Sequence, residues 1–182
     1  MGSSKSAQAL ITKFNYEERG MKVWLIKPAT DTRDGLTILH SRIGLEAQAQ
    51  VIKPEDDIYS MFVKEHADCN VIISDEAQFF TPEQVDQMRN IVDDLNIPVL
   101  NFGLKTDFRT RVFPGSLRLL EVSEEITEIK TICSCGRKAT VNARVINGQI
   151  VTEGEQVLLG GNDSYVAMCH RCWKQQIEKQ KH

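Results

Sequence analysis

The apolar residues of this chain follow two different spacings, and each predicts a different kind of element. Ala7, Leu10, Ile11 and Phe14 recur on one helical face, so we expect a helix that ends near Gly20. Short, unbroken apolar runs instead predict buried strands, and they occur at residues 23–26, 71–73 and 99–103. Helical and strand signals therefore alternate along the chain.

Further helices are predicted between and after these strands. The sequence Thr81-Pro82-Glu83-Gln84 combines a capping box with proline at the first helical position, and an apolar stripe continues from it to Leu95. Pro54 is expected to open an earlier helix, and residues 115–121 a short later one, whereas the polar segment 29–44 is expected to be a long loop. This alternation predicts an α/β fold with a mostly parallel sheet flanked by helices.

The pattern changes after Glu128. Residues 129–173 are rich in strand and turn signals, and they contain four of the five cysteines. We therefore predict two domains, an α/β domain at residues 1–128 and a smaller second domain at residues 129–182.

Composition and charge narrow the possible functions. The chain has 182 residues, of which 41% are hydrophobic and 26% charged, as in an ordinary globular protein. It has no apolar stretch of membrane-spanning length and no secretory pattern, so a cytoplasmic location without a membrane partner is expected. A net charge of −3 argues against nucleic acid as the main partner, because such binding usually needs a basic face.

The four cysteines form two close pairs, Cys133-Ser-Cys135 and Cys169-His-Arg-Cys172. Two turns that each present two thiolates match a structural Zn²⁺ site with four sulfur ligands. Two disulfides, or thiols that simply lie in a core, are the alternative interpretations, and His170 is an alternative ligand. The remaining cysteine, Cys69, precedes an apolar run and is expected to be a small buried residue.

A phosphate-binding motif is recognisable at the start of the chain, directly before the first predicted helix. Such a loop needs small residues whose N–H groups surround phosphate oxygens, then a lysine, then a hydroxyl that binds Mg²⁺. Lys5 and Ser6 fit the second half of this pattern, but Ser4 stands where a glycine is usual. The loop should also follow a strand, so a first strand is expected before residue 1. The alternative is that Met-Gly-Ser-Ser is the start of an expression tag.

Two carboxylates, Asp75 and Glu76, follow the strongest strand signal. Ligands of open α/β sheets bind at the carboxyl ends of strands, where an aspartate commonly supports Mg²⁺ and an adjacent glutamate can accept a proton. Gln78, Phe79 and Phe80 come next and suggest a pocket for a flat heterocycle. A solvated acidic pair is the simpler interpretation, and Asp-Glu-Ala-Gln is also similar to the D-E-x-x box of helicases.

These motifs occur in an order that resembles the class II, or cytosolic-type, thymidine kinases. The shared features cover almost the whole chain: the segment 1–6, Asp31-Thr32-Arg33, the segment 75–80, Asp107-Phe108, Gly160-Gly161 with Tyr165, and the paired cysteines. The resemblance implies a P-loop-type α/β domain and a zinc-stapled lasso domain. It also implies transfer of the γ-phosphoryl group of ATP to the 5′-hydroxyl of thymidine or deoxyuridine, which supplies TMP by salvage.

The resemblance also implies a role for each matching residue. Glu76 would be the catalytic base, and Ser6 and Asp75 would hold Mg²⁺. ATP and its phosphates would be bound by Gly2, Ser3, Ser4, Lys5, Ser6, Asp31, Thr32, Arg33, Asp75 and Gln78. The nucleoside would be bound by Phe79, Leu104, Phe108, Gln156, Val157, Leu158, Leu159, Gly160 and Tyr165. A homotetramer and feedback inhibition by dTTP are further expectations from the family.

The chain departs from the family pattern in three places. Ser4 replaces a glycine, the segment 110–115 is longer than the usual R-x-K-P-F-G run, and the first cysteine pair is C-x-C rather than C-x-x-C. Two other functions therefore remain open from the sequence. One is a nucleic-acid-dependent ATPase with a zinc module, and the other is a catalytically impaired nucleotide-binding homologue.

Overall fold

A computed structural model of the chain describes residues 4–29, 38–156 and 165–180. These residues form two compact units. The sheet unit comprises residues 4–104 and 113–126. The cysteine unit comprises residues 105–112 and the described residues from 127 onward, so the short segment 105–112 belongs with residues that follow much later in the chain. The domain division at residues 128 and 129 stays a prediction.

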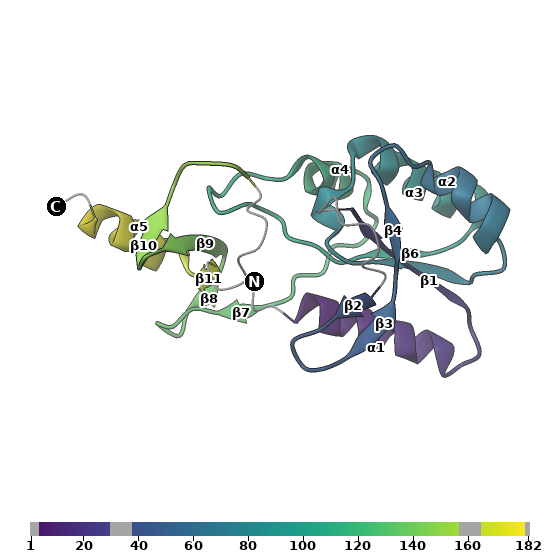
Figure 1. Cartoon of the computed structure of the whole chain (residues 1–182), viewed down its shortest axis with the longest axis horizontal. Helices are drawn as coiled ribbons and strands as arrows, with labels where there is room; N and C mark the ends of the chain where they lie inside the picture. Colours follow the sequence, from purple (N-terminus) through teal and green to yellow (C-terminus); the bar gives the residue numbers. More distant parts are fainter. Residues whose placement is uncertain (1–3, 30–37, 157–164, 181–182) are drawn as a thin grey trace. The chain divides into compact units, whose positions relative to one another are not determined.

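The sheet unit is built on four parallel strands. They are β1 (Val23–Pro28), β4 (Gln50–Ile52), β5 (Val71–Ser74) and β6 (Val99–Asn101), in the order β4-β1-β5-β6. Figure 1 shows helix α1 (Lys5–Glu17) on one side of this sheet and helices α2 (Ile58–Met61), α3 (Pro82–Leu95) and α4 (Pro114–Val122) on the other. The predicted α/β class with a parallel sheet between helices is therefore confirmed.

Both faces of the sheet are buried, which explains why the strands read as unbroken apolar runs. Along β5, Ile72 packs into the core under α2 and α3, whereas Val71 and Ile73 pack into the core under α1. Along β1, Trp24 and Ile26 face the first of these cores, and Leu25 faces the second. Alternate side chains thus enter two separate cores, one on each face of the sheet.

Several local expectations need correction. The helix expected at Pro54 begins at Ile58 instead, because the Asp57 side chain accepts the Ser60 N–H at 2.9 Å and caps the helix there. A π-helical turn, η1 (Phe62–His66), continues it.

The segment 29–44 is not entirely loop, because its last residues include strand β2 (Ile38–His40). This strand pairs antiparallel with β3 (Glu46–Gln48). Residues 30–37 of the predicted loop lie outside the described part of the chain.

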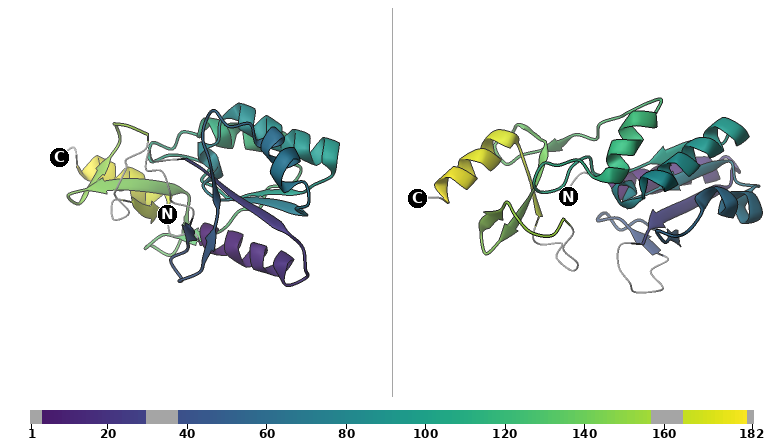
Figure 2. Two further views of the ribbon diagram at one scale, coloured as in Figure 1. Left: turned by 45° about the vertical axis from the view of Figure 1, so that its right-hand side comes forward. Right: turned by 90° about the horizontal axis from the view of Figure 1, so that it is seen from above.

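The cysteine unit contains the short strands that the sequence predicted, and these strands pair antiparallel. A hairpin of β7 (Thr131–Ile132) and β8 (Lys138–Ala139) precedes a three-stranded sheet with the order β10-β9-β11. Strand β9 (Val141–Ile146) lies between β10 (Gln149–Val151) and β11 (Tyr165–Met168), and helix α5 (His170–Lys179) follows (Figure 2).

None of the helices that the structure describes has both the length and the apolar character that crossing a membrane requires.

The capping box at the start of α3 is confirmed, and its glutamine has a second role. The Thr81 hydroxyl accepts the Gln84 N–H, and the Gln84 side-chain oxygen accepts the Thr81 N–H, both at 3.2 Å. The buried Gln84 amide also donates to the carbonyls of Lys53 and Asp56, at 2.7 and 3.2 Å. Gln84 therefore ties the start of α3 to the turn before α2.

We predict that Gln84→Ala destabilises the protein more than Thr81→Ala does. Loss of the cap alone should cost about 1 kcal/mol, whereas Gln84→Ala also removes the side-chain partner of two backbone carbonyls and should cost about 2–3 kcal/mol. The measurement is urea unfolding, with the exposed helix residue changed in Asn90→Ala as the control. Equal losses for the Thr81 and Gln84 variants would show that the link to the turn contributes nothing.

Candidate active site and metal centre

The first turn of α1 brings a hydroxyl to the end of β5. Ser4 precedes the helix, Lys5 and Ser6 begin it, and the Ser6 hydroxyl donates a hydrogen bond to Oδ2 of Asp75. The two predicted Mg²⁺ ligands are thus in direct contact although they are far apart in the sequence. Gly2 and Ser3, the other residues of the predicted phosphate loop, lie outside the described residues.

Asp75 is a buried carboxylate with one oxygen left over. Its side chain lies at the end of β5 with no exposed surface, and Oδ1 has no hydrogen-bond partner among the described residues. Burial raises the pKa of this carboxyl, the negative charge of Glu76 adds to the shift, and the Ser6 hydroxyl opposes it. An unpartnered carboxylate oxygen beside a serine hydroxyl is a suitable donor set for Mg²⁺, which prefers oxygen ligands.

Glu76 leaves the strand in an unusual backbone conformation. Its φ of 53° and ψ of 35° place it in the left-handed region, which costs a non-glycine residue energy unless neighbouring contacts hold it. Those contacts are present, because Asp75 N–H donates to the Ile26 carbonyl at 3.1 Å and Ala77 N–H donates to the Phe102 carbonyl at 3.0 Å. The sharp turn separates the two adjacent carboxylates, so that Asp75 is buried and Glu76 is half-buried.

The Glu76 carboxylate is held by a neighbouring amide. Gln78 lies in the 3-10 turn η2 (Ala77–Phe79) and donates from Nε2 to Oε2 of Glu76. Its Oε1 accepts the Leu104 N–H at 2.9 Å, so both ends of this buried amide are used within the protein. Gly103 packs so closely that a Cβ there would lie 3.0 Å from Gln78 Oε1. Gln78, predicted to bind ATP, is in this structure a support for Glu76.

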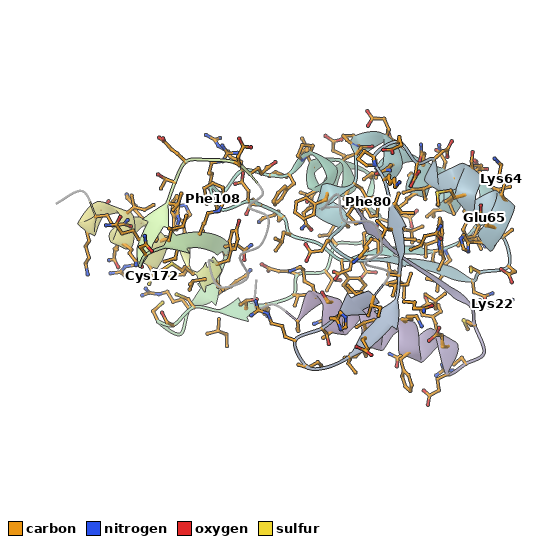
Figure 3. All side chains as sticks on the ribbon, viewed as in Figure 1. Lys22, Lys64, Glu65, Phe80, Phe108 and Cys172 are labelled. Carbon is orange, nitrogen blue, oxygen red and sulfur yellow. The ribbon has the colours of Figure 1, made fainter. Side chains whose placement is uncertain are left out.

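Two aromatic residues that adjoin in sequence have different positions. Phe80 is buried in the core under α3 (labelled in Figure 3), whereas Phe79 is half-buried and contacts Phe113 edge-on at 5.5 Å between ring centroids. Only Phe79 is therefore placed to offer a ring to a ligand. Leu104, the other nucleoside residue predicted in the sheet unit, receives a second tether because its carbonyl accepts the Ser116 hydroxyl at 2.6 Å.

Lys27 interacts with the two carboxylates, and the sequence reasoning did not name it. It lies near the end of β1, the strand next to β5, and it is half-buried. Burial lowers the pKa of its ammonium group, and the charges of Asp75 and Glu76 act in the opposite direction. Lys27 therefore places a partly desolvated cation near both carboxylates. The signal available in the sequence was a lysine at the end of an apolar run, which is too common to single out.

The cysteine unit holds a second group of predicted nucleoside residues. Phe108 is buried, and the guanidinium carbon of Arg144 lies 3.7 Å from the centroid of its ring. Arg144 also donates to the Tyr165 hydroxyl, from Nε at 2.9 Å and from Nη2 at 2.7 Å. Gln156 donates from Nε2 to Asp107 at 3.2 Å. The structure thus gathers Phe108, Gln156 and Tyr165 around Arg144 and Asp107, neither of which was predicted as a site residue.

The four paired cysteines converge at one point of the same unit. Their sulfur atoms all lie within 4.8 Å of one another, and those of Cys135 and Cys169 are 3.7 Å apart. A disulfide would need about 2.05 Å, whereas sulfurs at about 2.3 Å from a tetrahedral zinc ion are about 3.8 Å apart. The cluster suits a metal ion, and Cys69 stays apart from it as a buried free thiol.

Backbone N–H groups and neighbouring sulfur atoms give these thiols different pKa values. N–H groups of Cys135 and Cys169 directed at the Cys133 sulfur lower the pKa of that thiol to about 6. The neighbouring sulfurs of Cys135 and Cys169 raise the pKa of Cys172 to about 12, because another negative charge is unfavourable there. Four thiolates this close need a compensating cation, which a divalent metal would supply.

The remaining predicted site residues lie outside the described residues. They are Asp31, Thr32 and Arg33, predicted near the phosphates, and Val157, Leu158, Leu159 and Gly160, predicted to contact the nucleoside.

Comparison with known proteins decides the family. The sequence profile described as thymidine kinase matches residues 1–173. The chain belongs to the thymidine kinase family. Among its curated relatives, the thymidine kinase of Legionella pneumophila (strain Lens) is 48% identical over 178 residues, which cover 96% of this chain and 85% of the relative.

More distant thymidine kinases match over similar lengths. That of Ruegeria pomeroyi is 43% identical over 96% of this chain and 90% of its own length. That of Enterobacteria phage T4 is 41% identical over 98% of this chain and 94% of its own length. The predicted thymidine kinase resemblance and the predicted enzyme class are confirmed, and these relatives do not favour a nucleic-acid-dependent ATPase.

The raised pKa of Asp75 predicts how the stability of this protein depends on pH in the absence of nucleotide and added magnesium. Above the ordinary pKa of 3.8 and up to the raised one, the folded protein binds more protons than the unfolded chain, so stability falls as pH rises. Asp75→Asn removes this loss. The stability of the variant relative to wild type should therefore increase as the pH rises above 3.8, as measured by urea unfolding.

The exposed Asp68 provides a control with the opposite sign. Its hydrogen bond to Lys22 lowers the pKa of its carboxyl, so its contribution is present above the ordinary value of 3.8 and is lost as pH falls below it. Asp68→Asn should thus lose stability relative to wild type as the pH rises toward 3.8, and the difference should stay constant above that value. If both variants changed in the same direction, burial of Asp75 would not be the cause.

Proposed function

We propose that this chain transfers the γ-phosphoryl group of ATP to the 5′-hydroxyl of thymidine or deoxyuridine, giving TMP or dUMP and ADP. The observation that carries the proposal is the arrangement of two adjacent carboxylates at the end of β5. Asp75 is buried against the Ser6 hydroxyl, and Glu76 is turned away from it and held by Gln78. Adjacent carboxylates in different environments can divide metal binding and proton transfer between them.

The phosphates of ATP would lie at the N-terminus of α1. The N–H groups of a helix N-terminus and the residues before it attract anionic oxygens, and we assign Gly2, Ser3 and Ser4 to this role. Lys5 would stabilise the charge on the transferred group. We further assign Asp31, Thr32 and Arg33 to the phosphates by the family resemblance.

Ser6 and Asp75 would hold the Mg²⁺ that accompanies ATP. The unpartnered Oδ1 of Asp75 supports this assignment, since a buried carboxylate oxygen without a hydrogen bond is otherwise unfavourable. When bound, Mg²⁺ neutralises phosphate charge. The half-buried Lys27 would add a positive charge beside the same carboxylates.

Glu76 would act as the general base. The 5′-oxygen of the nucleoside bonds to the γ-phosphorus while the bond to the β–γ bridging oxygen breaks, and the hydroxyl proton passes to the Glu76 carboxylate. The hydrogen bond from Gln78 orients that carboxylate and leaves its other oxygen available.

The residues that would contact the nucleoside are assigned by the family resemblance. We assign to the nucleoside Phe79 and Leu104 of the sheet unit and Phe108, Gln156 and Tyr165 of the cysteine unit, together with residues 157–160.

We also propose that the metal of the four-cysteine cluster is a structural Zn²⁺. A homotetramer, dTTP inhibition and a cytoplasmic location remain predictions.

A nucleoside panel tests the reaction. ADP release is measured with ATP, Mg²⁺ and each common nucleoside in turn, and thymidine and deoxyuridine should give the highest kcat/KM. Nucleoside-independent ATP hydrolysis that DNA stimulates would instead support a nucleic-acid-dependent ATPase. ATP binding without turnover would support a catalytically impaired homologue.

Glu76→Gln is expected to lower kcat by about 10²–10⁴-fold with little change in thymidine affinity, because it keeps the shape of the side chain but cannot accept the proton. The exposed Glu83→Gln on α3 makes the same chemical change away from the strand end and should leave kcat unaltered. If the Glu76→Gln enzyme kept wild-type turnover, another group would have to be the general base.

Metal analysis of the purified protein should return about one zinc per chain. Cys172→Ser should reduce zinc content and loosen the cysteine unit, as followed by hydrogen exchange, because four-cysteine zinc binding contributes on the order of 10 kcal/mol to local folding. Cys69→Ala, which changes the cysteine outside the cluster, should leave zinc content unchanged. Four titratable thiols and no metal in wild-type protein would exclude the assignment.

A further inference from the structure

Arg144 is the largest fully buried side chain among the described residues, and its environment is unusual for a charged group. Only 1% of its surface is exposed, at a central position of strand β9. Arginine is rarely buried in this way unless its charge and donors are satisfied. Its hydrogen-bond partners are two backbone carbonyls and a tyrosine hydroxyl, and none of these is a carboxylate. A structural ion pair therefore does not account for its position.

The partners of Arg144 come from three separate stretches of the cysteine unit. Nη1 donates to the Glu155 carbonyl at 2.8 Å, and Nη2 donates to the Gln156 carbonyl at 3.1 Å. Nε and Nη2 both donate to the Tyr165 hydroxyl. The flat face of the guanidinium covers the Phe108 ring, which Figure 3 labels. One side chain thus joins residues 155–156, the start of β11 and the segment 105–112.

A second buried charge strengthens the same connection. The Asp107 carboxylate, whose side chain has no exposed surface, accepts the N–H groups of Arg109 and Arg111 at 2.9 Å. It also accepts the Gln156 side-chain amide. Gln156 is therefore held through its carbonyl by Arg144 and through its side chain by Asp107.

We propose that Arg144 is the positioning residue of the nucleoside site. It orients Phe108, Gln156 and Tyr165 by directing its donors at two of them and its flat face at the third. The inference rests on the proposed function, since it takes these three residues as nucleoside contacts. Four hydrogen bonds within the protein occupy the guanidinium, so Arg144 acts through its neighbours and not as a clamp on phosphate.

The geometry makes lysine a poor substitute for this arginine. A guanidinium offers a flat stacking surface and donors in a fixed plane, whereas an ammonium group is a compact point charge. Arg144→Lys therefore keeps the charge but loses both the stacking on Phe108 and the simultaneous bonds to residues 155, 156 and 165. Tyr165→Phe removes only the shared hydroxyl and leaves the guanidinium in place.

The test is steady-state kinetics of both variants with thymidine and ATP varied separately. Arg144→Lys should raise the thymidine KM by about 10- to 100-fold, equivalent to the loss of one or two buried hydrogen bonds, with the ATP KM within about twofold of wild type. Tyr165→Phe should raise the thymidine KM in the same direction. Their double variant should show less than the product of the single effects, because both changes break one contact. Arg137→Lys, at an exposed arginine of the same unit, is the matched control and should change neither KM.

The outcomes separate the two proposals. If wild-type enzyme fails to phosphorylate thymidine, the proposed function falls and the role of Arg144 falls with it. If wild-type enzyme is active and Arg144→Lys keeps its thymidine KM, the inference about Arg144 alone is overturned. A parallel rise of both KM values with a lower unfolding midpoint would also overturn it, in favour of a purely structural role. If Arg144→Lys does not fold, Tyr165→Phe, which makes the smaller change, is compared with wild type instead.

Discussion

Helices cover both faces of the four-stranded sheet. A charged side chain is therefore unfavourable along the strands and is accommodated where a strand ends. This constraint brings the reactive groups together. The pairing of β1, β5 and β6 aligns Ile26, Ser74 and Asn101, and Lys27 and Asp75 directly follow the first two of these positions. The first turn of α1 reaches the same edge and places Ser6 on Asp75. The position of the site follows from which surfaces the core leaves uncovered.

At that edge the backbone distinguishes two carboxylates that the sequence presents as neighbours. A regular strand would direct Asp75 and Glu76 to opposite faces of the sheet, one under α1 and the other under α3. The left-handed turn at Glu76 ends the strand instead, and the bonds from residues 75 and 77 to the strands on either side hold that turn. Gln78 then restrains the Glu76 side chain. The unfavourable backbone conformation is thus stabilised by surrounding contacts, as is common where a side chain must be directed at a reactant.

The parts of the structure that the sequence predicts well are those with a local chemical pattern. The unbroken apolar runs identified β1, β5 and β6, the capping box identified the first residue of α3, and the cysteine spacing identified the metal cluster. Short and polar strands were missed. Strand β4 begins with a glutamine, and β2 buries only Leu39, so neither carries a clear hydrophobic period.

The supporting residues of the site were also missed, and for a different reason. Arg144, Asp107 and Lys27 each interact with groups that are distant in sequence, so no local spacing identifies their roles. A lone arginine within a strand is equally typical of a solvated face. Even Gln78, which the sequence did single out, contacts groups that no local pattern could identify, because Leu104 lies 26 residues away.

The arrangement of the cysteines also sets the order in which the chain can fold. Cys135 and Cys169 are 34 residues apart, and all three strands of the small sheet lie between them. The entropy cost of closing such a loop grows only slowly with its length, so a metal bond closes it at a small additional cost over a shorter loop. Cys169 and Cys172 are nevertheless synthesised after every strand that they enclose. The metal-closed loop therefore cannot form before all three strands of the small sheet have been made.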